Sequence, residues 1–250
     1  MKDAEHNLLE FYRKIGEQND YSFRDDEYWS VVSAPAGYWP SLVINLDSEE
    51  ETNQLLEKMA EGIRNEGIPS LFISGAGQFG PAQGSVLKHH HFYPVDKWTV
   101  MEKGTSYCTE HNIPAGVVLR PLRGLAQIRD FTSIVNAELF RTLPADHRLL
   151  HGMAESDGVA LYGCFSGNEL VSGMLVLTSG NTAGLYLVVT RKERQRSGFG
   201  SLLLSHVAGK MKEAGVSKIV LHSSLQAVSF YQKNGFTVRG EMYIYRYSTI

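Results

Sequence analysis

Apolar positions in the first hundred residues recur with two different spacings. Over residues 3–17 they fall three or four positions apart, which predicts an amphipathic helix, and residues 55–63 repeat that spacing. Two short apolar runs, at 42–44 and 71–73, are typical of buried strands. Residues 75–91 are rich in Gly, Pro and His, so no regular element is expected there.

The second half of the chain alternates between the two patterns more regularly. Three strand-like stretches are separated by Ser-Gly-Asn turns, so they are expected to pair as antiparallel hairpins. A helical pattern with Leu202, Leu203 and Val207 on one face follows them and ends at Gly215. In order, the predicted elements are a strand at 117–120, a helix at 123–141, strands at 158–165, 169–178 and 182–190, a helix at 198–214, a strand at 218–222, a short helix ending at Gly235 and a strand at 236–247.

Both halves mix helices with strands, which predicts an α/β protein. The three tryptophans all lie among the first hundred residues, and the turn-prone segment 112–116 follows. This change in composition predicts a domain boundary near residue 115. We therefore expect an N-terminal α/β domain over residues 1–115 and a second domain over residues 116–250.

The composition is that of a globular protein. Hydrophobic residues make up 43% and charged residues 20% of the 250 positions, so a sizeable core can form. A net charge of −3 gives no general attraction to nucleic acid or to a membrane. The start of the chain has no basic leader, no apolar run reaches the ~20 residues of a membrane helix, and only Cys108 and Cys164 occur. These features predict a cytoplasmic protein without nucleic-acid or membrane partners.

One short stretch, RQRSGFGSLLL at residues 194–204, places Gly198 and Gly200 among basic residues at a helix start. The N-terminus of a helix has unpaired N–H groups and a partial positive charge, so it attracts anions. Glycines let the backbone approach a ligand closely. A strand precedes and a helix follows, as in a pyrophosphate cradle, although the same spacing also arises by chance at an ordinary helix start.

Two motifs, in the expected order, resemble those of the GCN5-related N-acetyltransferase (GNAT) superfamily. Residues 195–200, QRSGFG, are similar to its Gln/Arg-x-x-Gly-x-Gly/Ala pattern. Residues 227–236, AVSFYQKNGF, are similar to its Ala-x-x-Phe-Tyr-x-x-x-Gly-Phe segment. The element order also agrees, so the resemblance covers about residues 117–250. It implies a mixed central sheet flanked by helices, the acyl-CoA N-acyltransferase-like fold.

The resemblance also implies an activity. Such a protein transfers an acetyl group from acetyl-CoA, its co-substrate, to a primary amine of a small molecule or peptide by direct attack, without a metal. The cofactor would lie where two central strands splay apart. Tyr231 matches the tyrosine that protonates the leaving thiolate, a step that needs a proton donor near neutral pH. The residues implied to bind the cofactor are Val188, Val189, Thr190, Gln195, Arg196, Ser197, Gly198, Phe199, Gly200, Ser201 and Ser224.

The chain departs from the family pattern at three places, the first of which is Lys192, where the family often has Pro shortly after the cofactor strand. The family often has Asn where this chain has Ser224, and many members carry a glutamate base on the strand that corresponds to residues 182–187, which has no acidic residue here. A water chain, Tyr186, Glu155 or Asp157 could take the proton from the amine. The missing carboxylate leaves a second interpretation open, a non-catalytic acyl-CoA-binding or protein-interaction module on the same fold.

Two further motifs in the first half lack the context that their usual functions need. Residues 71–80 match the Gly-x-Gly-x-x-Gly pattern of dinucleotide-binding proteins, but Pro81 follows where a helix must begin. Adjacent histidines at 89–91 point in different directions, and no second ligand cluster accompanies them, so no metal site is expected. The N-terminal domain is expected to wall the acceptor site, and one interpretation makes it a degenerate copy of the GNAT fold.

Overall fold

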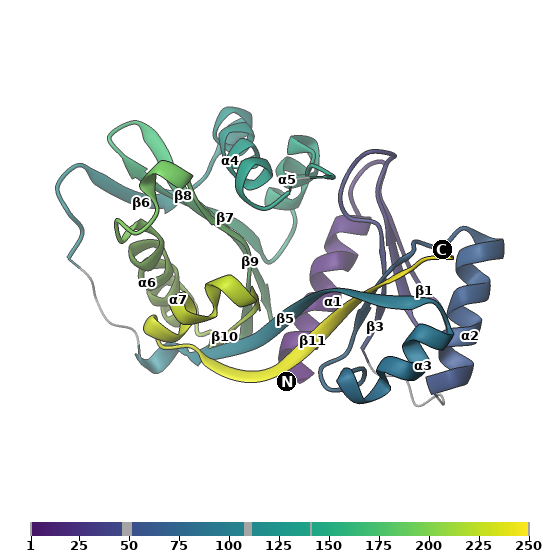
Figure 1. Cartoon of the computed structure of the whole chain (residues 1–250). Coiled ribbons are helices and arrows are strands. Elements are labelled where there is room, and N and C mark those ends of the chain that lie inside the picture. Colours follow the sequence, from purple (N-terminus) through teal and green to yellow (C-terminus); the bar gives the residue numbers. More distant parts are fainter. Residues whose placement is uncertain (1, 47–51, 108–111, 141, 250) are drawn as a thin grey trace.

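The strands that the structure describes all belong to one mixed sheet. The structure is a computed structural model and describes residues 2–46, 52–107, 112–140 and 142–249. Its 11-stranded sheet has the order β1-β2-β3-β4-β11-β5-β10-β9-β8-β7-β6, and helices flank it (Figure 1). The predicted fold class, α/β with a mixed central sheet flanked by helices, is confirmed.

Helices and strands alternate in both halves of the chain. The first half contains α1 (Lys2–Gly16), β1 (Ser22–Asp25), β2 (Ser30–Ser33), β3 (Leu42–Asn45), α2 (Thr52–Glu61), β4 (Leu71–Ser74), α3 (Gly84–His89) and β5 (Phe92–Gly104). The second half contains β6 (Val117–Pro121), α4 (Gly124–Glu138), α5 (His147–Ala154), β7 (Val159–Ser166), β8 (Glu169–Ser179), β9 (Thr182–Thr190), α6 (Phe199–Glu213), β10 (Lys218–Ser224), α7 (Val228–Lys233) and β11 (Thr237–Tyr247).

The core lies on both faces of the sheet. On one face α4 and α5 pack with α1, burying side chains such as Phe131, Leu150 and Phe11. On the other face α6 and α7 bury side chains such as Leu203 and Tyr231. The apolar residues of α4 and α6, spaced at helical intervals in the sequence, form one buried side of each helix that packs on the sheet, as predicted.

The two halves repeat one order of elements. In the first half β1, β2 and β3 pair in antiparallel fashion, α2 follows, and β4 returns parallel to β3. In the second half β7, β8 and β9 pair in antiparallel fashion, α6 follows, and β10 returns parallel to β9. A short helix, α3 or α7, and a long strand, β5 or β11, then complete each half.

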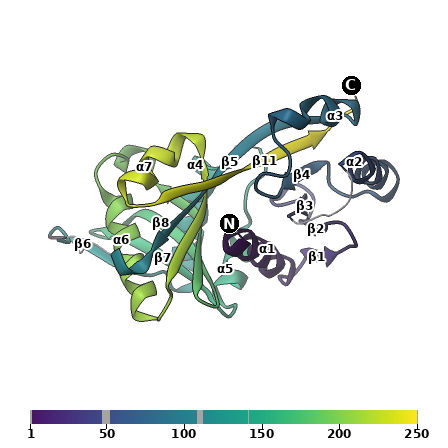
Figure 2. The same ribbon diagram turned by 90° about the horizontal axis from the view of Figure 1, so that it is seen from below.

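The last long strand of each half pairs with a strand of the other half. Strand β5 pairs antiparallel with β10, and β11 pairs antiparallel with β4. The two long strands also pair with each other, so they run side by side between the halves (Figure 2). The sheet therefore contains strands from both sides of residue 115. The domain boundary that the sequence places near this residue stays a prediction.

Several elements of the first half escape the sequence patterns. The prediction that residues 75–91 contain no regular element is wrong, because α3 lies within them. Strand β5 is also missed, because Pro94, Asp96 and Lys97 interrupt the alternation of apolar and polar residues. These residues are tolerated since that end of β5 is largely exposed and a register shift lies there.

Helix α1 packs on β1 and β2 of the first half and also on β8 and β9 of the second half. Asn7 is fully buried there; its amide donates to the carbonyl of Leu177 at 3.2 Å and accepts from the hydroxyl of Tyr186 at 2.7 Å. The rings of Phe11 and Tyr186 stack with centroids 3.9 Å apart. A Cβ on Gly184 would overlap the Asn7 side chain, so glycine makes this approach possible.

We expect the substitution Asn7→Ala to lower the free energy of unfolding by about 2–3 kcal/mol, because it leaves two buried polar groups without partners. Denaturant unfolding followed by circular dichroism measures this loss. The control is Asn112→Ala at an exposed position, which should change the value by less than about 0.5 kcal/mol. Equal effects of the two substitutions would mean that Asn7 does not hold α1 on the sheet.

Candidate functional site

Strands β9 and β10 pair over only part of their length. Their parallel ladder ends where Leu185 lies beside Leu221. Beyond that point β10 stays paired with β5 as far as Ser224, whereas β9 stays paired with β8 as far as Thr190. The carboxyl ends of the two strands therefore have no ladder between them. Ligands of α/β sheets bind at such strand ends, where backbone groups lack partners.

A β-bulge lies in β9 where the strands separate. The register between β8 and β9 shifts between Gly173 and Leu175, and β9 contributes the extra residue. Leu187, within the bulge, has a φ of +50°, which is uncommon for a leucine. Val188 follows it. Strained backbone of this kind is concentrated at functional sites, so the bulge itself indicates one.

The loop after β9 leads into the N-terminus of α6. Its residues 192–198 are exposed. Arg196 (φ +62°) and Gly198 (φ +84°) are left-handed, an alternation with ordinary residues that is typical of a backbone anion nest. No side chain caps α6, so the N–H groups of its first turn remain available to an anion. The implied cofactor residues 195–201 all lie in this loop and first turn.

The two glycines of this helix start have different structural reasons. A Cβ on Gly198 would meet no neighbour, so glycine is favoured there by its left-handed backbone alone. A Cβ on Gly200 would lie 3.2 Å from Cζ of Phe230 and 3.4 Å from Oγ1 of Thr190. Gly200 therefore lets α6 begin close to α7 and to the end of β9.

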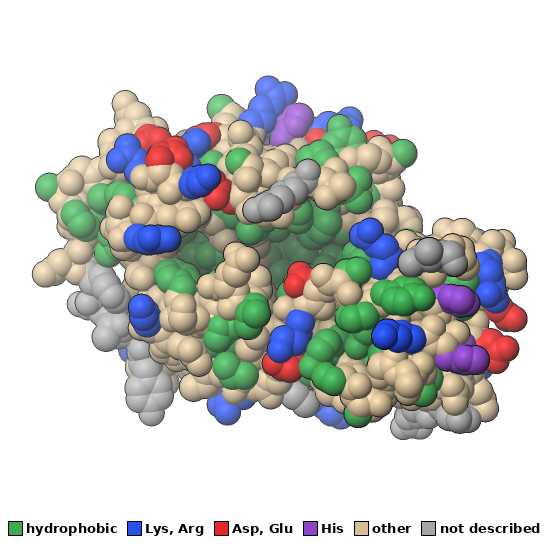
Figure 3. All heavy atoms as spheres, in the orientation of Figure 1, with side chains coloured by type: hydrophobic (Ala, Val, Ile, Leu, Met, Phe, Trp, Pro, Cys, Tyr) green, Lys and Arg blue, Asp and Glu red, His purple; other side chains and the backbone are tan. Residues whose placement is uncertain are grey.

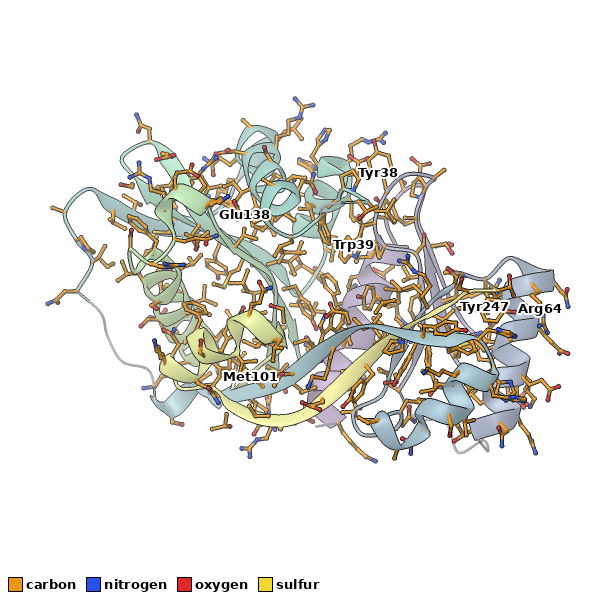
Figure 4. All side chains as sticks on the ribbon, viewed as in Figure 1. Tyr38, Trp39, Arg64, Met101, Glu138 and Tyr247 are labelled. Carbon is orange, nitrogen blue, oxygen red and sulfur yellow. The ribbon has the colours of Figure 1, made fainter. Side chains whose placement is uncertain are left out.

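Glu138, at the end of α4, connects this helix to the loop before α6 by hydrogen bonds (Figure 4). Its carboxylate accepts hydrogen bonds from the Lys192 backbone N–H and from Nε2 of Gln195, each at 3.1 Å. Nε2 of Gln195 also donates to the Thr190 carbonyl at 3.1 Å. Arg196 forms no ion pair with any residue that the structure describes, so its charge is available to an incoming anion.

A cavity of about 360 Å³ opens where β9 and β10 separate. Val188 and Ser224 line it from the strand ends, and Tyr231 lines it from α7. Figure 3 shows a hollow on this side of the molecule with hydrophobic side chains on its floor. Burial raises the pKa of Tyr231 above its ordinary value of 10, so the hydroxyl stays protonated at neutral pH.

The implied cofactor residues thus fall into two groups. Val188 and Ser224 line the cavity, whereas Val189, Thr190 and the loop 195–201 do not. The hydrogen bond from Gln195 to the Thr190 carbonyl joins the end of β9 to that loop. The cavity and the helix start are therefore the two ends of one continuous stretch of chain.

The first half supplies the opposite wall of the cavity. Phe11 and Tyr12 come from α1, Trp39 from the loop before β3, and Asp96 and Trp98 from β5. Trp39 points into the space between the halves in Figure 4. Sequence reasoning missed these residues because none lies in a motif. The one signal was the concentration of tryptophans in the first half, since two of the three line this cavity.

His222 of β10 also lines the cavity, with its ring centroid 6.1 Å from that of Trp98. The residue is half-buried, but both ring nitrogens are buried without a hydrogen-bond partner among the described residues. Burial lowers the pKa of His222 to about 4, so the ring is neutral at pH 7. Unpartnered buried polar atoms cost about 1–3 kcal/mol each, so a ligand or water that bonds this ring is favoured.

The structure separates the three candidate bases that the sequence offers. Glu155 lies at a different hollow, beside Pro121 and Arg123, and Asp157 is exposed before β7 and outside the cavity lining. Tyr186 does line the cavity, but its hydroxyl donates to Asn7, and burial raises its pKa well above 10. Tyr186 is thus protonated near neutral pH and is unsuited to act as a base.

The second half of the chain also matches a known family by sequence. The match is to the family model described as an acetyltransferase (GNAT) domain, over residues 127–246. Residues 127–246 are a GNAT acetyltransferase domain. This confirms the resemblance drawn from the two motifs. The GNAT domain contains the separated strands, the loop before α6 and Tyr231.

Solved structures share the fold of the whole chain at low sequence identity. A GCN5-related N-acetyltransferase from Kribbella flavida has a TM-score of 0.71 and 12% identity, covering 99% of this chain and 96% of that chain. A tandem GNAT protein from the clavulanic acid biosynthesis pathway has a TM-score of 0.62 and 9% identity, covering 100% of this chain and 96% of that chain. At these identities the likeness concerns the fold alone.

A curated relative matches a shorter stretch. The uncharacterized protein YyaT of Bacillus subtilis (strain 168) is 32% identical over 65 residues, which cover 26% of this chain and 44% of the relative. The match thus spans less than half of that relative's length.

Neither a metal cluster nor a membrane segment is expected from the sequence. Among the described residues, no group of three or more His, Cys, Asp or Glu side chains is placed to hold a metal ion. No helix in the described ranges is long and apolar enough to cross a membrane. Cys164 is a free, buried thiol whose pKa burial raises to about 11, and Cys108 lies outside the described residues.

Replacing glycine by alanine should change the stability in opposite directions at the start and in the middle of α6. We expect Gly198→Ala to lower the free energy of unfolding by about 1–2 kcal/mol, because alanine is strained at this left-handed N-cap of the GNAT domain. Gly209→Ala, in the middle of the same helix with open space around it, should raise the value by about 0.5–1 kcal/mol. Urea unfolding of both variants measures the difference. Changes of the same sign would contradict this account of Gly198.

The buried histidine predicts a loss of stability at low pH. The unfolded chain binds a proton near the ordinary pKa of 6.5, whereas folded His222 has a pKa of about 4. The unfolded state therefore holds more protons between these values, so stability is complete above pH 6.5 and is lost as the pH falls toward 4.

His222→Phe should reduce this loss by on the order of 2–3 kcal/mol between about pH 7 and about pH 4.5. The measurement compares urea unfolding of the variant and the unsubstituted protein at both pH values. Carboxylates such as Asp146, whose pKa the neighbouring Arg148 lowers, titrate in both proteins and cancel in the comparison. Identical pH dependence of the two proteins would show that His222 is protonated without penalty in the folded state.

Proposed function

We propose that this protein is an N-acetyltransferase that moves the acetyl group of acetyl-CoA to a primary amine of a small molecule or peptide. The observation that carries the proposal is the position of Tyr231, a protonated side chain in the cavity where β9 and β10 separate. From that cavity the chain continues through Thr190 to an uncapped helix N-terminus. A thioester at the cavity and a pyrophosphate at the helix start match the two ends of acetyl-CoA.

The backbone of the GNAT domain would hold the cofactor in this proposal. The N–H groups of residues 195–201 bind the pyrophosphate, with the charge of Arg196 beside them. The pantetheine arm pairs with the free edge of β9 at residues 188–190, where the ladder with β10 has ended. Ser224, at the end of β10, offers a hydroxyl on the opposite side of the gap.

The reaction proceeds by direct attack. The amine nitrogen forms a bond to the thioester carbonyl carbon, and the carbon–sulfur bond breaks. The leaving thiolate takes the hydroxyl proton of Tyr231. The attacking nitrogen loses one proton to solvent water, and Tyr231 regains one proton from solvent, so the protons balance. Because burial keeps Tyr231 protonated, the donor is ready in the resting protein.

We also propose that residues 1–115 form a degenerate copy of the GNAT fold whose role is to wall the acceptor site. The repeated order of elements supports the copy, and the side chains of Phe11 and Trp39 in the cavity support the wall. The connection between β3 and α2 corresponds to the cradle loop, but its sequence at 46–51 is LDSEEE, with no glycine and four acidic residues. Those residues repel a pyrophosphate, so the first half would not bind a second CoA.

The second candidate is a protein that binds acyl-CoA without transferring the acyl group. It is favoured by the lack of a carboxylate on β9 and by the hydrogen bond that engages Tyr186. The two candidates differ in turnover and agree in CoA binding.

We expect Tyr231→Phe to lower kcat for acetyl transfer by about 100-fold or more, with the dissociation constant for CoA nearly unchanged, because only proton donation is lost. A thiol-release assay measures kcat, and calorimetry measures CoA binding. Tyr93→Phe is the control, since Tyr93 lies on β5 away from the cavity lining. Normal turnover in Tyr231→Phe would remove the proposed proton donor. CoA binding without any turnover in the unsubstituted protein would favour the second candidate.

A further inference from the structure

The wall of the cavity opposite the strand ends is aromatic. Phe11 lies with its ring stacked on Tyr186, and its centroid is 6.2 Å from that of Trp39. The ring centroid of Trp39 in turn lies 4.7 Å from that of Phe140, which follows the end of α4. These rings contact one another before any ligand arrives. The wall is thus preformed, and it favours an apolar ligand surface over a hydrated one.

The charge of the cavity is equally one-sided. Asp96 is the only carboxylate in its lining, and no Lys or Arg side chain of the described chain lines it. Asp96 forms no ion pair among the described residues, since neighbouring Lys97 pairs with Glu241 at 2.6 Å. The cavity can therefore attract one cation at its exposed carboxylate, and it offers no partner to an anion.

The polar atoms that remain are suited to a neutral or cationic nitrogen. His222 has two ring nitrogens without hydrogen-bond partners among the described residues, and in the neutral ring one of them can accept a hydrogen bond. Tyr231 is part of the same lining. An amine placed among these groups can donate to His222 while its carbon body covers the aromatic wall.

The size of the cavity sets a further limit. A volume of about 360 Å³ is near the lower end of the range for small-molecule sites, roughly 300–1,000 Å³. The end of the pantetheine arm must occupy part of it. What remains suits a compact body of about one ring.

We infer that the acceptor is a compact primary amine with an aromatic or aliphatic body and no anionic group. The inference rests on the proposed acetyl transfer and narrows it to one substrate class. Free amino acids are disfavoured because their carboxylate would meet no cation. Aminoglycosides are disfavoured because several ammonium groups would compete for the single carboxylate of Asp96.

The test compares 2-phenylethylamine with L-phenylalanine, which has the same ring and amine but adds a carboxylate. With acetyl-CoA, kcat/KM should favour 2-phenylethylamine by about 100-fold, since an unpaired buried charge is costly. Kanamycin and a free peptide N-terminus complete the panel. Binding of each amine in the presence of CoA, which cannot react, is measured by calorimetry as a readout independent of turnover.

Two variants connect the preference to the cavity. Phe140→Ala, which shortens the aromatic wall, should raise the KM for 2-phenylethylamine by about tenfold. Asp96→Asn should raise it by up to about fivefold, because exposed ion pairs are weak. Both should leave the KM for acetyl-CoA unchanged. Asp157→Asn, at an exposed position outside the cavity lining, is the control for removing a carboxylate.

The outcomes separate this inference from the proposed function. Tighter binding of 2-phenylethylamine than of phenylalanine, weakened by both variants but without acetylation, would support the ligand class that the cavity selects and would overturn the proposed acetyl transfer. Faster acetylation of phenylalanine, kanamycin or the peptide would keep the function and overturn the acceptor class. Failure of 2-phenylethylamine to bind in the presence of CoA would also overturn it.

Discussion

The exchange of β5 and β11 between the two halves is the constraint on which the site depends. Strand β10 is bonded along its whole length to β5, a strand of the other half, but its ladder with β9 ends at Leu221. The bulge around Leu187 bends β9 while β5 holds β10 in line. The opening between β9 and β10 is thus maintained by backbone hydrogen bonds on its two outer sides.

The same exchange determines what faces the opening. Because β5 lies against β10, Asp96 and Trp98 reach the cavity from a strand that precedes the GNAT domain in the chain. Helix α1 contacts Tyr186 through Asn7 and Phe11, and it lines the cavity with Phe11 and Tyr12. On the strand-end side the site consists mainly of backbone, and the first half contributes aromatic side chains and Asp96 to the cavity. Under the proposed function, changes in those first-half side chains would alter the acceptor without disturbing the backbone that would bind CoA.

Sequence patterns predicted the second half well because its signals are local. Helix α6 shows its apolar spacing, and the hairpins of β7, β8 and β9 show their turn residues. Gly198 and Tyr231 lie in motifs that mark a helix start and a short helix. The side of the cavity that β5 and β10 contribute was not predictable in this way. His222 is an ordinary strand residue by sequence, and Asp96 and Trp98 lie in a strand whose pattern Pro94 disrupts. Their shared cavity results from pairing between distant strands, for which one sequence contains no local signal.

The strand exchange also has a consequence for how the chain reaches its folded state. Strand β4 is bonded on one side by β3, but its other neighbour, β11, is near the far end of the chain. During synthesis the first half therefore emerges with an unpaired sheet edge, and β5 has no partner until β10 and β11 have followed it. Such edges are where unfinished proteins associate with one another. Neither half can complete its part of the sheet alone. The first half therefore stays exposed to association until the second half has been synthesised, although the two halves occupy similar positions in the finished sheet.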